Sequence, residues 1–265
     1  MIAGVGAASD TTTSWRAWAL RPVVLFVATY TIVGVLHELT HALVAYALSV
    51  PSTLFHVGVN LDRAHATLNQ LAVIGVAGPL FALVIGLFSL GAYTRSHNSR
   101  LGLPLLYLVM FGVSTFFGNL MSTAFVGDFS RLALTLQLPM MVRYAASVLG
   151  TLALCGVSFL IGIELRTWTP VGVSATKAMI GIIALPAILG TAITLLIFLP
   201  MPSAFAFARM GESLFWIAAA VGVMVSRKHP TESRGKLDLG WPDITLLLAA
   251  VLLLRLTVRG ITFAP

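Results

Sequence analysis

Residues 23–48 read VVLFVATYTIVGVLHELTHALVAYAL, an apolar run that contains three ionisable side chains in its second half, His37, Glu38 and His41. A run of about 20 apolar residues is long enough to cross the hydrocarbon core of a bilayer as a helix. A charged side chain in that core costs about 2.5–3.5 kcal/mol on insertion scales, so such residues usually have a function. This stretch therefore predicts a transmembrane helix with a functional polar cluster.

The three ionisable residues form the pattern HExxH. Two histidines four positions apart lie on one face of a helix, where their imidazole nitrogens can bind one Zn²⁺. Glu38 lies beside them, placed to take a proton from water on the metal. The alternative is a chance polar cluster that lines a cavity or binds another cofactor. We expect a metal site in which His37 and His41 are ligands, Glu38 is the catalytic base and Zn²⁺ is the cofactor.

The composition is that of an integral membrane protein. Of the 265 residues, 58% are hydrophobic and only 9% are charged, whereas soluble chains carry about 25% charged residues. The basic residues are scattered among short loops and form no basic, aromatic-rich face, which argues against a nucleic-acid partner and favours contact with the lipid bilayer. We expect a multi-pass protein of a plasma or inner membrane.

The apolar runs predict an all-α fold of six or seven transmembrane helices. We expect a mobile tail over residues 1–15, a core of three helices and a hairpin over 16–135, and additional helices of the same domain over 136–265. Apolar residues alternate from Phe55 to Leu61, which favours a short β-hairpin between the first two helices. The expected spans are 22–48, 71–93, 101–125, 139–163, 178–199 and 213–226, with 244–256 as a marginal seventh.

A third metal ligand can be sought by enumeration, because the chain has nine acidic residues. Catalytic zinc usually takes three protein ligands and leaves a fourth position for water. Glu38 is taken as the base. Most other acids lie in tails, in the hairpin, at helix ends or in loops exposed to water, and Asp243 is assigned to such a loop. Asp128 remains, at the end of the third apolar run. The alternative for Asp128 is a helix-capping acid.

Three features in sequence order resemble the site-2 protease family of intramembrane zinc metalloproteases. They are HExxH in a first core helix, Ala77-Gly78-Pro79-Leu80 in the next, and Asn119 ahead of the pair Gly127-Asp128. The resemblance covers residues 23 to about 132 and implies a membrane-associated β element after the first core helix. It also implies Asp128 as the third zinc ligand and Asn119 as a catalytic residue that holds substrate or the oxyanion. The alternative for Asn119 is a hydrogen bond between helices.

The chain departs from the family pattern around the third ligand, where Ser122 replaces a proline and Phe129 follows the acid in place of glycine. The leading expectation is an intramembrane zinc metalloendopeptidase that cleaves a peptide bond in or near a transmembrane segment of a membrane protein or peptide. The second is a catalytically inactive integral subunit that serves as a scaffold with partner subunits in a larger membrane complex. A transporter ranks below both, because the later spans offer almost no polar residues.

Overall fold

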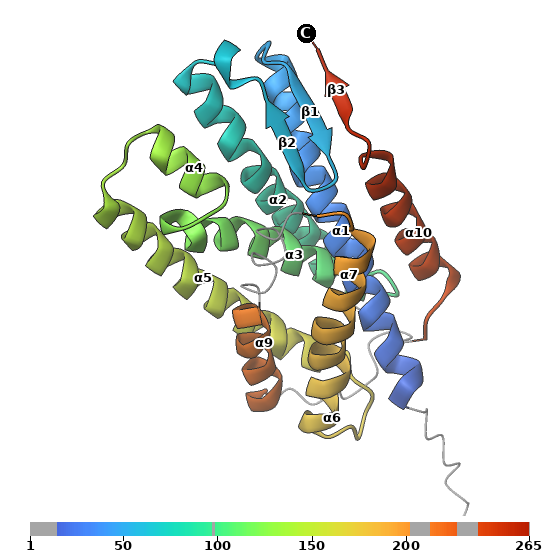
Figure 1. The fold of residues 1–265 in the computed structure, drawn as a ribbon. Helices are drawn as coiled ribbons and strands as arrows, with labels where there is room; N and C mark the ends of the chain where they lie inside the picture. Colours follow the sequence, from blue (N-terminus) through green and yellow to red (C-terminus); the bar gives the residue numbers. More distant parts are fainter. Residues whose placement is uncertain (1–14, 97–98, 202–212, 227–237, 265) are drawn as a thin grey trace, which may run out of the picture.

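The computed structural model describes residues 15–96, 99–201, 213–226 and 238–264, which are mostly helical with one small sheet (Figure 1). Residues 1–14 of the expected N-terminal tail (1–15) lie outside the described part, and Trp15 is the first residue of helix α1. Five helices are long and apolar enough to cross a membrane, which indicates that the protein is embedded in a lipid bilayer. They are Trp18–Ala47, Leu68–Ser96, Gly102–Ala124, Met140–Arg166 and Ala175–Ile197.

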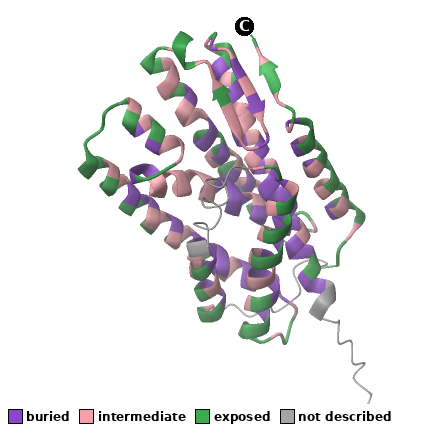
Figure 2. Cartoon of the chain, viewed as in Figure 1, coloured by how far each residue is buried: buried purple, intermediate pink, exposed green. Residues whose placement is uncertain are grey.

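The first helix, α1 (Trp15–Ala47), is central to the fold because it packs against α2, α3 and α10. Helix α5 in turn packs against α3 and α9. Figure 2 shows buried residues where the helices face one another and exposed residues along their outward faces. The other helices are α2 (Leu68–Ser96), α3 (Gly102–Met121), α4 (Asp128–Thr135), α5 (Met140–Arg166), α6 (Ala175–Met179), α7 (Thr191–Ile197), α9 (Ser213–Val225) and α10 (Trp241–Leu256).

Short irregular helices connect or interrupt these elements. The span Ala175–Ile197 is continuous, but its middle is π-helical at η3 (Ile180–Ala184) and η4 (Pro186–Gly190). Proline lacks a backbone N–H and cannot complete the α-helical hydrogen-bond ladder, which accounts for an irregularity at Pro186. Two 3₁₀ turns, η1 (Arg63–His65) and η2 (Ser122–Ala124), precede α2 and α4 respectively.

Many outward-facing side chains are large and apolar. Phe88 on α2 is 79% exposed, and Met141 on α5 is 84% exposed. Soluble monomers rarely leave contiguous apolar surface of this kind in water, because its hydration is unfavourable. The outward faces of these helices are therefore suited to contact with lipid tails.

The sheet joins segments from both halves of the chain. Strands β1 (Ser52–Phe55) and β2 (Gly58–Leu61) lie between α1 and α2 and pair antiparallel. Strand β3 (Ile261–Phe263), near the C-terminus, pairs antiparallel with β1, so the strand order is β2-β1-β3. Strand β3 is not predicted by the sequence, because three residues are too few to show an alternating pattern.

The regions of the expected sixth and seventh spans form shorter helices in the described part. Helix α9 has 13 residues and α10 has 16. At 1.5 Å per residue these helices measure about 20 and about 24 Å, less than the hydrocarbon thickness of about 30 Å. A count of six or seven spans therefore stays a prediction.

The assignment of Asp243 to a wet loop is wrong. Asp243 lies in the first turn of α10 and is 3% exposed. Its carboxylate accepts hydrogen bonds from Nε of Arg21, a fully buried residue of α1, at 3.1 and 3.2 Å. The nearby residues Asp238 and Gly240 made this segment read as a loop, whereas packing of α10 against α1 buries the carboxylate beside a cation.

Candidate metal centre

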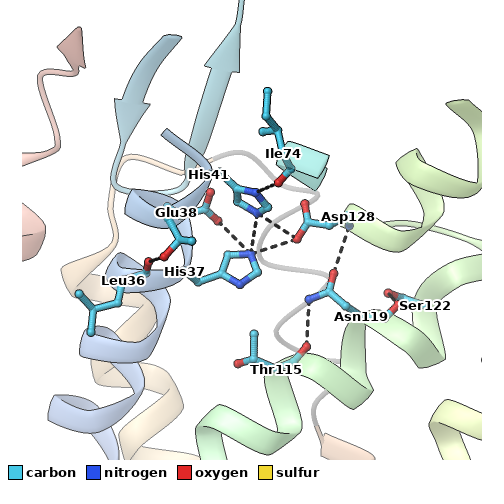
Figure 3. Close-up of polar contacts among 10 residues, drawn as sticks. Leu36, His37, Glu38, His41, Ile74, Thr115, Asn119, Ser122 and Asp128 are labelled. Atoms are coloured by element: carbon cyan, nitrogen blue, oxygen red, sulfur yellow. Dashed lines mark hydrogen bonds and ion pairs between the residues drawn. The ribbon is translucent and has the colours of Figure 1, made fainter. Parts of the chain in front are cut away.

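The structure brings His37, His41 and Asp128 together, although Asp128 follows the histidines by about 90 residues (Figure 3). The two histidines lie one turn apart on α1 and are each 6% exposed, and Asp128 is the first residue of α4. His37 Nε2 lies 3.0 Å from Asp128 Oδ2 and 3.1 Å from His41 Nε2. His41 Nε2 lies 3.5 Å from the same carboxylate oxygen. Three potential ligand atoms therefore converge on one point.

The hydrogen bond made by His41 Nδ1 fixes the orientation of the ring, and with it the direction of the Nε2 lone pair. His41 Nδ1–H donates a hydrogen bond to the carbonyl oxygen of Ile74 on α2, at 2.6 Å. A carbonyl oxygen can only accept, so Nδ1 carries the hydrogen and Nε2 of the neutral ring presents its lone pair to the centre. Metal-binding histidines usually have such a backbone or carboxylate partner on the outer nitrogen. The backbone of α2 thus orients His41 towards the site.

Gly78 on α2 makes room for the His41 ring. A Cβ added at Gly78 would lie 2.4 Å from His41 Nε2, a distance that real Cβ contacts do not show. Any larger residue would displace either the imidazole or the helix. Gly78 belongs to the stretch that resembles the family motif, but only the structure shows that the glycine packs on the ring.

The position of Asp128 depends on the turn that precedes it. Gly127 has a φ of 98°, a left-handed conformation that glycine adopts without steric cost. The turn lets the backbone N–H of Asp128 donate to Asn119 Oδ1 at 3.1 Å, and Asn119 Nδ2 donates to the carbonyl oxygen of Thr115 at 3.0 Å. Both ends of the Asn119 amide are thus engaged, and the residue holds the start of α4 in place.

Glu38 is adjacent to the three converging groups but is not one of them. Its Oε1 lies 4.0 Å from His37 Nε2, and its side chain is 20% exposed. Among the described residues, no donor forms a hydrogen bond with this carboxylate. The carboxylate is therefore available to a water molecule or another ligand at the site.

Two groups that support the site were missed by the sequence analysis. The Ile74 carbonyl and the Thr115 carbonyl are backbone atoms, which no residue pattern reports. The described residues contain one group of three histidine or acidic side chains that could hold a metal ion, and it consists of His37, His41 and Asp128. No protein-family model, curated protein or solved structure matches this chain.

Proposed function

We propose that the protein is an intramembrane zinc metalloendopeptidase, a divergent relative of the site-2 protease family. The observation that carries this proposal is the convergence of His37 Nε2, His41 Nε2 and Asp128 Oδ2 beside the carboxylate of Glu38, which accepts no hydrogen bond from a described residue. All four residues belong to or adjoin helices that are apolar enough to lie in a bilayer. This arrangement supports hydrolysis of a peptide bond at membrane depth.

The spacing of the three atoms is compatible with Zn²⁺. Ligands about 2.0–2.1 Å from a tetrahedral zinc ion lie about 3.3 Å from one another. The three observed separations are 3.0, 3.1 and 3.5 Å. Two imidazoles and one carboxylate are also a ligand set of catalytic zinc, which leaves a fourth position for water.

The roles of the protein groups follow from their positions. When bound, Zn²⁺ supplies a Lewis acid that lowers the pKa of a coordinated water to about 7 and polarises a carbonyl. Glu38 would accept a proton from the attacking water and pass it to the leaving amine, since its carboxylate is close to the site and accepts no hydrogen bond from a described residue. Asn119 acts through Asp128, which it positions. The contact with substrate or the oxyanion that the resemblance implies for Asn119 stays a prediction.

The substrate in this proposal is a transmembrane segment that has locally unwound, because the carbonyl groups of an intact helix are already hydrogen-bonded. Strand β2 is an edge strand, since β3 pairs with the other side of β1. An extended substrate segment can add to such an edge through main-chain hydrogen bonds. We propose a membrane protein or membrane peptide of a plasma or inner membrane as substrate.

The second candidate is an inactive scaffold subunit, and the engagement of Asn119 favours it. Both ends of the Asn119 amide bond to the protein itself, so only the second Nδ2 hydrogen and the second Oδ1 lone pair remain for a substrate. Ser122 and Phe129 also depart from the family pattern at this place. Under this alternative the protein binds partner subunits and cleaves nothing.

The test compares wild-type protein with Glu38→Gln for metal content and for cleavage of co-expressed membrane peptides. We expect one zinc ion per chain in both proteins, and a loss of cleavage of at least about 10²-fold in the variant, because proton transfer by a positioned side chain contributes 10²–10⁴-fold. Glu164→Gln is the matched control, since Glu164 lies on α5 and its carboxylate bonds to Tyr93 at 2.7 Å, away from the site. Metal-free wild-type protein would refute the zinc centre. Bound zinc with no cleavage, together with stoichiometric partner subunits, would favour the scaffold.

A further inference from the structure

A cavity of about 520 Å³ lies at the end of the helix bundle away from the sheet, near α6 and α9 in Figure 1. It is bounded by the end of α5 at Arg166, the loop that contains Gly172, the start of α6 and the end of α9 at Met224. None of these residues belongs to the candidate metal centre. The cavity therefore calls for an explanation of its own.

Arg166 brings a buried positive charge to this cavity. Arg166 is 3% exposed, and its Nη1 and Nη2 donate to neutral oxygens, Thr169 Oγ1 and the Val173 carbonyl, both at 2.7 Å. Its buried Nε has no acceptor. No carboxylate among the described residues forms an ion pair with Arg166, and Glu164 accepts a hydrogen bond from Tyr93 instead. Buried charges in proteins are normally paired, whereas this guanidinium has no counter-ion among the residues that the structure describes.

The start of the span Ala175–Ile197 adds a second positive feature to the same cavity. Ser174 caps this helix, and its Oγ accepts a hydrogen bond from the Lys177 backbone N–H at 3.3 Å. The N–H groups of Ala175 and Thr176, in the first turn, have no acceptor within the helix. Aligned peptide dipoles give such a terminus a partial positive charge, which favours an anion. Ser174 and Ala175 both line the cavity beside Arg166.

The location indicates the kind of anion. The cavity lies where three apolar helices end, the depth at which lipid headgroups meet water. The end of α2 lies on the same side of the bundle, since Tyr93 bonds to Glu164 of α5, and it carries the exposed Arg95. Basic residues at such a boundary attract acidic lipids.

We propose that this cavity binds a phosphate group, held by the Arg166 guanidinium and by the N-terminus of the helix that begins at Ala175. The phosphate belongs either to the headgroup of an acidic phospholipid or to a free phosphate ion. The site is independent of zinc and of peptide cleavage. It uses charge-assisted hydrogen bonds, which arginine forms with phosphate in bidentate geometry.

The test measures binding of phosphatidylglycerol, phosphatidylcholine and inorganic phosphate to the full-length, delipidated protein in detergent. Native mass spectrometry gives the lipid dissociation constants, and thermal unfolding reports the response to phosphate. We expect wild-type protein to prefer phosphatidylglycerol by about tenfold or more, and Arg166→Gln to lose that preference. A rise in the unfolding temperature with phosphate, without a lipid preference, would assign the site to the free ion. The absence of both responses would overturn the proposal.

Two further variants separate the site from the stability of the fold. Ser174→Asp keeps a good N-cap but places a carboxylate at the cavity, so we expect a folded protein that loses the preference. Ser174→Asn keeps the cap without the charge and should behave as wild type. Arg95→Gln removes an exposed arginine on the same side and should leave the preference intact. Unchanged binding by both Arg166→Gln and Ser174→Asp would refute the site.

Discussion

Two buried clusters of ionisable residues tie α1 to segments far along the chain, and they differ in how donors and acceptors meet. In the first, the Arg21 guanidinium faces the Asp243 carboxylate, so donors point at acceptors. In the second, His37, His41 and Asp128 place two ring nitrogens and a carboxylate oxygen within 3.5 Å of one another.

In the second cluster, potential ligand atoms face one another. His41 already uses its Nδ1–H on the Ile74 carbonyl, so its Nε2 lone pair faces the Asp128 oxygen. Such an arrangement is repulsive unless a proton or a metal ion lies between the atoms. The comparison teaches that burial of charge alone does not single out a candidate metal site, whereas the convergence of potential ligand atoms does.

The largest effect is expected from removal of the carboxylate in the second cluster. Asp128→Ala deletes one of three proposed ligands. Loss of a group that only supports a ligand lowers metal affinity by about 10–100-fold, so we expect zinc affinity to fall by more than about a hundredfold here. Zinc per chain, measured by elemental analysis after dialysis against a weak chelator, checks this. Full zinc occupancy in Asp128→Ala would remove this residue from the site.

The first cluster should respond in stability and not in metal content. Arg21→Met leaves the Asp243 carboxylate buried, with the hydrogen bond from the Gly240 backbone N–H at 3.0 Å and the longer 3.5 Å contact to Arg100. Breaking a buried pair costs about 3–5 kcal/mol, so we expect a loss of about 3 kcal/mol in the free energy of unfolding in detergent. The double variant Arg21→Met/Asp243→Leu should recover most of it. Loss of zinc from Arg21→Met would show that the stability of the Arg21–Asp243 pair and metal binding by the second cluster are coupled.

A smaller effect is expected where α2 packs on the His41 ring. Gly78→Ala places a Cβ against the imidazole, so we expect zinc affinity to fall by about 10–100-fold, the range for disturbed ligand support. The matched control is Gly75→Ala on the same helix, because a Cβ at Gly75 meets no atom within 4 Å. Equal zinc affinity in the two variants would contradict the packing role of Gly78.

The smallest effect is expected at Asn119. Asn119→Ala removes the acceptor for the Asp128 N–H, and we expect zinc affinity to fall by about tenfold. Zinc titration and the cleavage rate at saturating zinc are measured side by side. A lower rate with unchanged zinc affinity would instead support a contact between Asn119 and substrate.

Much of the candidate site could be expected from the sequence, for reasons that particular residues illustrate. His37 and His41 share a helical face because of their spacing, and Asp128 could be selected because acidic residues are rare in this chain. The burial of Asp243 and its pairing with Arg21 could not be predicted from the sequence in this way. Its ion pair joins residues 222 positions apart and exists only through the packing of α10 on α1.

The sequence by itself determined the apolar helices and the HExxH pair, because a long apolar run and a four-residue spacing are local properties of the chain. Tertiary structure alone decided that β3 joins β1, that Gly78 faces His41 and that no carboxylate of the described residues pairs with Arg166. It also decided that the Asn119 amide holds the Asp128 backbone. These facts depend on which helices and strands lie side by side, and the free energy of that packing is distributed over many contacts that no single motif records.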